Sequence, residues 1–146
     1  MALPEAIELE VVTPQRHVLA ETVQAIEIPG KEGYLGVLPG HAPLITELGI
    51  GILAYRKGAD TRYLTIVHGY AEVLPDRVIV LAEISERAEE IDIERTRVAQ
   101  ARAQAALAKV SAGSEEWQEQ RLAVDRAMVR MQAVSKVGAL IGTQKH

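Results

Sequence analysis

The chain has 146 residues, 48% hydrophobic and 25% charged, a length that suits one globular unit or two small ones and excludes a large barrel enzyme. Its formal net charge of −4 disfavours general binding to nucleic acid or to an anionic membrane. The lack of Cys excludes disulfides, thiolate metal sites and thiol nucleophiles, and the lack of Phe beside one Trp and four Tyr disfavours a base-stacking surface.

The first ten residues carry acids where a signal peptide has basic residues followed by an apolar run. No stretch approaches the roughly 20 apolar residues of a membrane-spanning helix. We therefore expect a soluble protein, and the absence of Cys suits a reducing cytoplasm.

Composition changes near Glu89. All six Pro and eight of the eleven Gly precede this residue, and an Ala-rich stretch without Pro follows it. Residues 1–88 hold 7 basic and 12 acidic residues, whereas residues 89–146 hold 9 and 8. We predict two domains with these boundaries.

The first domain shows the apolar and polar alternation of half-buried strands. Ile7–Val11 and Val23–Ile28 alternate cleanly, and Gly58-Ala59-Asp60 and Pro75-Asp76 supply turns. Further strands are expected over residues 49–55, 62–67, 70–74 and 78–82. Many short strands with regular turns predict an antiparallel sandwich or barrel.

Within this domain, the segment Glu32–Pro43 combines turn residues with apolar side chains. One interpretation is a folded connection in which Leu35 and Leu38 pack inward. The other is a rigid loop that presents Tyr34 to a partner. The residue pattern leaves both interpretations open.

The second domain has the pattern of two helices. Asp92 is a good N-cap for a helix that runs to about Val110. Ser114 caps a second helix, which we expect to end near Val137 because Gly138 is a stop signal. The short link between them predicts an antiparallel hairpin, and the whole chain is therefore of the α+β class.

Two apolar stripes with heptad-like spacing are expected to face each other in this hairpin. Small Ala side chains bury little area, at roughly 0.8 kcal/mol per CH₂. The pair is therefore either permanently docked or held so weakly that a partner can displace it. The stripes are Val98, Ala101, Ala105 and Ala108 in the first helix, and Val124, Ala127, Met131, Val134 and Ile141 in the second.

Catalytic and metal-binding motifs are missing from the sequence. There is no phosphate-binding P-loop and no H-E-x-x-H, and no Ser lies in G-x-S-x-G. The four histidines, at 17, 41, 68 and 146, have no ligand spacing. We expect neither an enzyme nor a metal site.

One basic cluster allows two interpretations. Arg126 and Arg130 share a helix face, and Ile91–Arg95 opens the first helix. Paired guanidinium groups match phosphate oxygens, and Asp92 can accept a hydrogen bond from a ribose or an adenine. The alternative is a capped helix with a solvated basic face.

Several motifs together resemble the epsilon subunit of bacterial F-type ATP synthases. Glu32-Gly33-x-Leu35-Gly36 followed by Pro39–Leu44 is similar to the signature of that family. Gly69–Val73 with Pro75, and Ile91-Asp92-x-x-Arg95, are similar as well, so the resemblance spans nearly the whole chain.

The resemblance implies a sandwich of about ten strands followed by two helices. It implies a non-catalytic rotor subunit of the central stalk that contacts the gamma subunit and the c-ring and couples rotation to ATP synthesis. It also implies a helical arm that can extend into the catalytic head of alpha and beta subunits and block ATP hydrolysis. The complex would lie at the cytoplasmic face of the bacterial inner membrane, which the subunit meets only through the complex.

The resemblance also implies site residues. The c-ring contact maps to Glu32, Gly33 and Tyr34, with His41 nearby, and some relatives have a carboxylate in place of Tyr34. No cofactor is required, but ATP is a candidate regulatory ligand, and Thr96 stands where ATP-binding relatives have Ala. The matching ATP positions are Glu86, Ile91, Asp92, Arg95, Arg126 and Arg130, and the arm would use Arg121, Arg126, Arg130 and Lys136.

A second hypothesis is a stand-alone ATP-binding sensor. It would require tight ATP binding by a monomer without a stalk partner, and it leaves the apolar loop at Tyr34 and Leu35 without a use. Co-purification with a gamma-like partner separates the two hypotheses.

Overall fold

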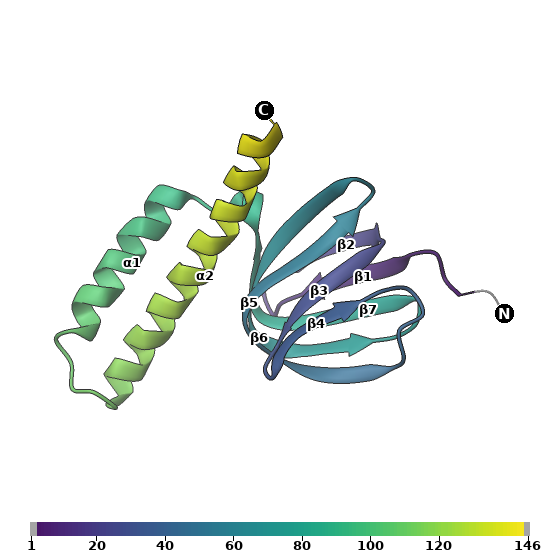
Figure 1. The fold of residues 1–146 in the computed structure, drawn as a ribbon. Helices are drawn as coiled ribbons and strands as arrows, with labels where there is room; N and C mark the ends of the chain where they lie inside the picture. Colours follow the sequence, from purple (N-terminus) through teal and green to yellow (C-terminus); the bar gives the residue numbers. More distant parts are fainter. Residues whose placement is uncertain (1–2, 145–146) are drawn as a thin grey trace. The chain divides into compact units, whose positions relative to one another are not determined.

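A computed structural model describes residues 3–144, with side chains described as far as Val137. The chain divides into two compact units between Ala88 and Glu89. The first unit is a β-sandwich and the second a pair of helices (Figure 1). The α+β class expected from the sequence is confirmed.

The sandwich contains seven strands in one continuous sheet, in the order β2-β1-β7-β6-β5-β3-β4. Every neighbouring pair is antiparallel except β1 and β7, which are parallel, so the expectation of a purely antiparallel sheet is wrong. Local alternation cannot show that the first strand inserts beside the last. The strands are β1 (Ile7–Val12), β2 (His17–Val23), β3 (Ala25–Gly30), β4 (Gly33–Val37), β5 (Leu44–Lys57), β6 (Asp60–Val73) and β7 (Arg77–Arg87).

The expected count of about ten strands is also wrong, because β5, β6 and β7 are long and each serves both layers. In β6, Leu64 and Ile66 face the core in one half, whereas Ala71 and Val73 do so in the other. The inward-facing positions therefore change parity near His68, which has a positive φ of 55°. The predicted separate strands 62–67 and 70–74 are one strand that bends from layer to layer.

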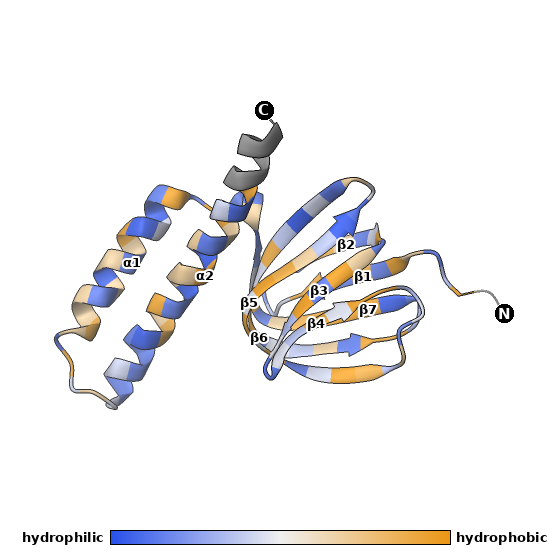
Figure 2. Cartoon of the chain, in the orientation of Figure 1, coloured by the Kyte–Doolittle hydropathy of each residue, from blue (hydrophilic) through white to orange (hydrophobic). Residues whose placement is uncertain are grey.

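The parity change defines the two layers. The first layer consists of β2, β1, the first half of β7, the second half of β6 and the first half of β5. The second consists of β4, β3 and the remaining halves of the three long strands. Hydrophobic residues recur along the strands (Figure 2), and the core between the layers is aliphatic apart from Tyr55.

The second unit contains α1 (Ile93–Leu107) and α2 (Glu115–Gln144), preceded by a single 3₁₀ turn, η1 (Ala88–Glu90). Both predicted N-caps are confirmed. The Asp92 carboxylate accepts a hydrogen bond from the Arg95 N–H at 3.1 Å, and Ser114 Oγ accepts one from the Trp117 N–H at 3.1 Å. These acceptors satisfy first-turn donors that have no partner within the helix.

Both predicted helix ends are wrong. The first helix stops at Leu107 rather than Val110, and the second continues through Gly138 to Gln144. A glycine inside a helix costs only about 1 kcal/mol relative to Ala, which did not suffice to end α2. Gly113, in the connection between the helices, has a positive φ of 83°.

The predicted stripe on α1 is wrong, whereas that on α2 is supported. Val98 is 57% exposed, and the three alanines of its stripe are exposed as well. The buried residues of α1 are Thr96 and Ala103, seven positions apart on one face. On α2, Val124 and Ala127 are buried and Met131 and Val134 half-buried, while the Ile141 side chain lies outside the described residues.

Candidate functional site

The β3–β4 hairpin places Glu32 and Tyr34 at a tight turn. Gly30 and Gly33 form the last pair of the ladder, and the φ of 137° at Gly33 disfavours any other residue. The Lys31 N–H donates to the Glu47 carbonyl at 2.9 Å, which ties the turn to β5. Glu32 and Gly33, two of the predicted c-ring residues, therefore lie on an exposed turn that is tied to β5.

Tyr34 is exposed, yet the protein fixes its ring. Its side chain is 59% accessible, and its hydroxyl accepts a hydrogen bond from the Ile52 N–H at 3.2 Å. Gly51 leaves room for the ring, since a Cβ at this position would lie 2.6 Å from Tyr34 Oη. The hydroxyl is anchored, and the exposed part of the ring remains available to a partner.

Both interpretations of the Glu32–Pro43 segment are partly correct. Leu35 packs against the hydrophobic core, as the folded-connection interpretation requires. Leu38 is 62% exposed and does not pack inward. The segment is therefore anchored by one leucine and presents Tyr34 and the other leucine to solvent.

His41 lies away from the Glu32 turn. The five-residue strand β4 separates the turn from the Pro39–Pro43 connection, so the two lie at opposite ends of β4. The His41 Nδ1 lies 2.7 Å from the Ala42 carbonyl oxygen, to which its N–H can donate, and the Gly40 N–H donates to Pro75 at 2.8 Å. The structure does not bring His41 together with the other predicted c-ring residues.

Sequence reasoning missed an apolar surface on the first layer. Ile45, Tyr70 and Leu81 are 69%, 57% and 56% exposed. We call these three residues the outer apolar face. Tyr70 pairs directly with Leu81 across the β6–β7 ladder, and Ile45 lies opposite Glu72, two residues along β6 from Tyr70.

Acidic side chains surround the outer apolar face, and a groove adjoins it. Glu47 lies opposite Tyr70, and Glu72 lies between Ile45 and Ile79 in the ladder. A groove of about 410 Å³ runs along Tyr70 and Leu81 to the β1–β2 turn at Thr13 and Pro14. The uninterrupted apolar run of residues 78–82 was the available signal, since it places hydrophobic residues on both faces of one strand.

The predicted ATP-binding residues fall in both units, since Glu86 lies in β7 and the other five in the helical unit. Asp92 serves as the α1 cap, and Thr96 is fully buried, with its hydroxyl donating to the Asp92 carbonyl at 2.8 Å. Arg126 and Arg130 are half-buried neighbours on α2. The Nε of Arg126 is buried and finds no acceptor within the described part of the chain.

The remaining arm residues lie on the surface of α2. Arg121 forms an ion pair with Asp125 at 3.6 Å, one helix turn away, and Lys136 is exposed. Such exposed pairs are worth at most about 1 kcal/mol and are easily exchanged for another carboxylate. None of the helices within residues 3–144 is both long and apolar enough to cross a bilayer.

Both units match known families. Residues 6–88 match "ATP synthase, Delta/Epsilon chain, beta-sandwich domain", and residues 89–135 match "ATP synthase, Delta/Epsilon chain, long alpha-helix domain". The chain is 43% identical over 136 residues to ATP synthase epsilon chain 2 of Syntrophotalea carbinolica, which covers 93% of this chain and 99% of that protein. It is 51% identical over 102 residues to the ATP synthase epsilon chain of Koribacter versatilis, which covers 70% and 72%.

Solved structures show the same fold. A chain in the cryo-EM structure of the Euglena gracilis mitochondrial ATP synthase (OSCP/F1/c-ring) matches with a TM-score of 0.66 at 25% identity, covering 97% of this chain and 84% of that one. A chain of the Tetrahymena thermophila mitochondrial central stalk and c-ring matches with 0.53 at 13% identity, covering 87% and 95%, which shows the fold alone. The chain therefore belongs to the ATP synthase delta/epsilon family, and its bacterial relatives are epsilon chains, a non-catalytic component of the synthase.

Proposed function

We propose that the chain is a rotor subunit of the central stalk of a proton-translocating ATP synthase. It binds the gamma subunit and the c-ring and couples their rotation to ATP synthesis on other subunits. Family membership supports this role, and the Euglena match comes from an OSCP/F1/c-ring assembly. The main observation behind the proposal is the outer apolar face, because exposed apolar patches are typical of surfaces that bind another protein and are uncommon on free monomers.

The gamma subunit is the occupant that we assign to the outer apolar face. Large apolar side chains rimmed by polar groups are typical of protein interfaces. Glu72 lies among them in the ladder, and Glu47, which also pairs with Lys31, lies opposite Tyr70, so the complementary gamma surface should be apolar with basic residues at its edge.

A binding experiment tests this assignment. We expect Tyr70→Ser with Leu81→Ser to weaken binding to purified gamma subunit at least tenfold in a titration, since two anchors at the centre of an interface typically cost more than 1 kcal/mol each. Leu38→Ser is the matched control, because Leu38 is as exposed but lies outside the outer apolar face. Unchanged affinity of the double variant would refute the assignment.

The Glu32–Gly33–Tyr34 turn is the proposed contact to the c-ring. The exposed ring of Tyr34 supplies an apolar contact with a fixed orientation, and the neighbouring Glu32 adds one carboxylate. Because Tyr34 replaces a carboxylate of some relatives, this contact should depend less on salt than an ionic one. His41, at the other end of β4, would reach the c-ring only as a separate part of the contact.

The helical unit is the proposed inhibitory arm. When it extends, Arg121, Arg126, Arg130 and Lys136 would meet carboxylates of the alpha and beta subunits and block ATP hydrolysis. The small side chains of the hairpin, with alanines on both helices, support this mobility, because they bury little apolar area. No residue of the arm is proposed to be catalytic.

ATP is the proposed regulatory ligand of the folded arm, although the subunit requires no cofactor. The buried Nε of Arg126, which has no acceptor among the described residues, supports an anion near this face of α2. Thr96 already uses its hydroxyl within α1, so it offers no donor to adenine. A ligand that binds only the folded arm shifts the population towards it and relieves inhibition.

Calorimetry of the isolated chain tests the ATP proposal, and heat of binding that Arg126→Met abolishes is the expected result. No binding heat at millimolar ATP would contradict a regulatory role for ATP.

The alternative function is a stand-alone ATP-binding sensor. This sensor would bind ATP without a gamma partner, so co-purification of the chain with gamma would contradict it. In the rotor assignment, the chain lies peripherally at the cytoplasmic face of the bacterial inner membrane, held there by the complex.

A further inference from the structure

The last four residues of β7 form an edge of the sandwich. The parallel ladder between β1 and β7 ends at Leu81, and from Ile84 to Arg87 the strand pairs only with β6. The chain leaves this edge directly for the helical unit. A strand segment that is hydrogen-bonded on one side only unfolds locally more easily than one that is paired on both sides.

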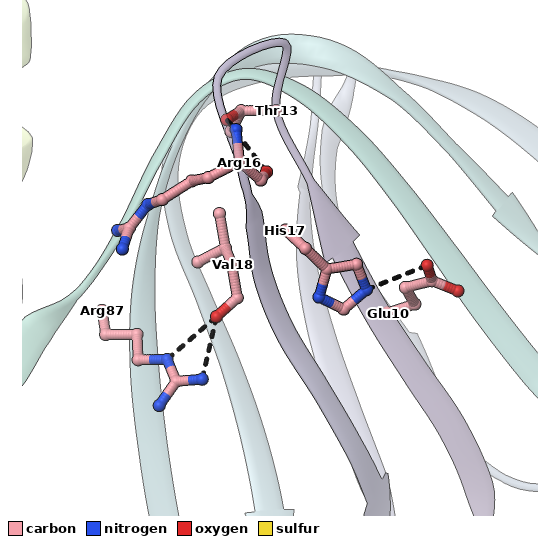
Figure 3. A network of polar contacts seen from close by, with 6 residues as sticks. All are labelled: Glu10, Thr13, Arg16, His17, Val18 and Arg87. Atoms are coloured by element: carbon pink, nitrogen blue, oxygen red, sulfur yellow. Dashed lines mark hydrogen bonds and ion pairs between the residues drawn. The ribbon is translucent and has the colours of Figure 1, made fainter.

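One side chain joins this edge to β2, which is an edge strand of the sheet. Arg87 donates from Nε and Nη2 to the carbonyl oxygen of Val18, at 3.0 and 2.8 Å (Figure 3). Val18 is buried and belongs to β2, which is an edge strand and not a ladder neighbour of β7. Hydrogen bonds from a charged donor are stronger than those between neutral groups.

A second hydrogen bond supports the same segment. The Glu86 N–H donates to the hydroxyl of Thr65 at 3.0 Å, in addition to the β6–β7 ladder. Thr65 is almost fully buried, so water does not compete readily for this bond. Beyond these contacts, Ala88 is buried, whereas Glu89 and Glu90 are exposed.

We propose that Arg87 and Thr65 act as a clamp that fixes the end of β7. When the helical unit moves, the chain up to Ala88 then keeps its position in the sandwich. Residues 89–91, which precede the Asp92 cap, act as the hinge. The sandwich keeps its contacts to the rotor while the arm changes position. A regulatory role for the clamp rests on the proposed mobile arm. The stabilisation of the β7 end by Arg87 and Thr65 does not depend on that proposal.

Hydrogen exchange of the full chain tests the clamp. In Arg87→Met, we expect the amides of residues 85–88 to exchange about tenfold faster or more, since hydrogen bonds to charged groups are among the stronger ones. The amides of β1 should change less than about twofold. Arg77→Met is the matched control at the other end of β7, because Arg77 is exposed and contacts Asp76 at 3.6 Å; it should leave residues 85–88 unchanged.

Two results would overturn the proposal. Unchanged exchange rates at residues 85–88 in Arg87→Met would show that Arg87 does not stabilise the end of β7. An equal increase of the exchange rate in every strand would show that Arg87 stabilises the whole sandwich instead. Thr65→Val, which removes only the acceptor for Glu86, should give a smaller rise confined to the same residues; a wider rise counts against the clamp. Inhibition by the arm is measured separately, as ATP hydrolysis by the assembled complex. A negative result for the proposed function can therefore be distinguished from a negative result for the clamp.

Discussion

Gly69 is the residue at which the bent strand β6 allows no side chain. Its φ is 121°, and a Cβ at this position would lie 2.0 Å from the Leu81 carbonyl oxygen. The neighbouring backbone of β7 cannot move without disturbing the ladder that carries Tyr70 and Leu81. The bend between the layers and the outer apolar face therefore depend on Gly69 as well as on the positive φ of His68.

Gly69→Ala should lower the free energy of unfolding by about 3 kcal/mol or more, because both the backbone conformation and the contact with Leu81 become unfavourable. Gly36→Ala is the control, since a Cβ at that position would meet no atom within 4 Å and the φ there is ordinary. That change should stay within about 0.5 kcal/mol. Urea unfolding of both variants measures the difference, and equal costs would contradict the proposed role of Gly69.

Glu21 is a carboxyl whose ionised form the fold favours. A hydrogen bond from Lys57 lowers the pKa of Glu21 below its ordinary value of 4.5, against partial desolvation that raises it. A lowered folded-state pKa means that this group stabilises the fold above the unfolded pKa. The contribution is lost as the pH falls through the folded pKa.

Lys57→Met should raise the pKa of Glu21 towards its ordinary value and should reduce stability near neutral pH more than at low pH. NMR titration of the Glu21 carboxyl follows the pKa directly. Lys31→Met is the control, because Lys31 pairs with Glu47 instead. An unchanged Glu21 pKa in Lys57→Met would contradict the assignment of Lys57 as the main cause.

At the scale of elements, α1 shows how a helix of small side chains can mislead. Val98 and the alanines in its stripe have the right spacing but are exposed. Thr96 is buried instead, because its hydroxyl is satisfied by the Asp92 carbonyl. On a helix with many alanines, hydrophobic contrast between faces is too weak to identify the packed one.

A pair of identical substitutions tests the packed face of α1. Ala103→Leu should destabilise the helical hairpin by about 1 to 3 kcal/mol through overpacking, whereas Ala101→Leu on the exposed face should be nearly neutral. Exchange protection of the α1 amides reports the effect. The reverse order would restore the stripe expected from the sequence.

Local chemistry was predictable at the two helix N-caps and in the first strand. Asp92 and Ser114 cap helices because they supply acceptors to nearby N–H groups, and Ile7, Leu9 and Val11 face the core because a strand has a period of two. The parallel pairing of β1 with β7 and the parity change at His68 were not predictable. They depend on long-range neighbours that no local pattern encodes.

The candidate site divides in the same way. The turn at Glu32 and Tyr34 was found from the family signature, and its exposure agrees with a contact site. The outer apolar face was missed, because its three residues come from different strands and meet only through the sheet register. The separation of His41 from Glu32 likewise follows from the length of β4 in space rather than from closeness in sequence.

At the scale of the whole molecule, the sandwich and the helical unit have separate tasks in our account. Every member of the main core cluster lies between Ile7 and Ala82, so the sandwich has a complete core without the helices. A chain ending at Ala88 should therefore fold and retain the outer apolar face. It should bind gamma but lack the arm.

The comparison of ATP hydrolysis by the catalytic complex with the full chain and with the chain ending at Ala88 tests the account most directly. Both chains must first be shown to bind gamma equally, so that a difference in rate reports the arm alone. We expect faster hydrolysis with the shortened chain, while ATP synthesis remains coupled to rotation. Equal hydrolysis rates with the two chains would contradict an inhibitory arm.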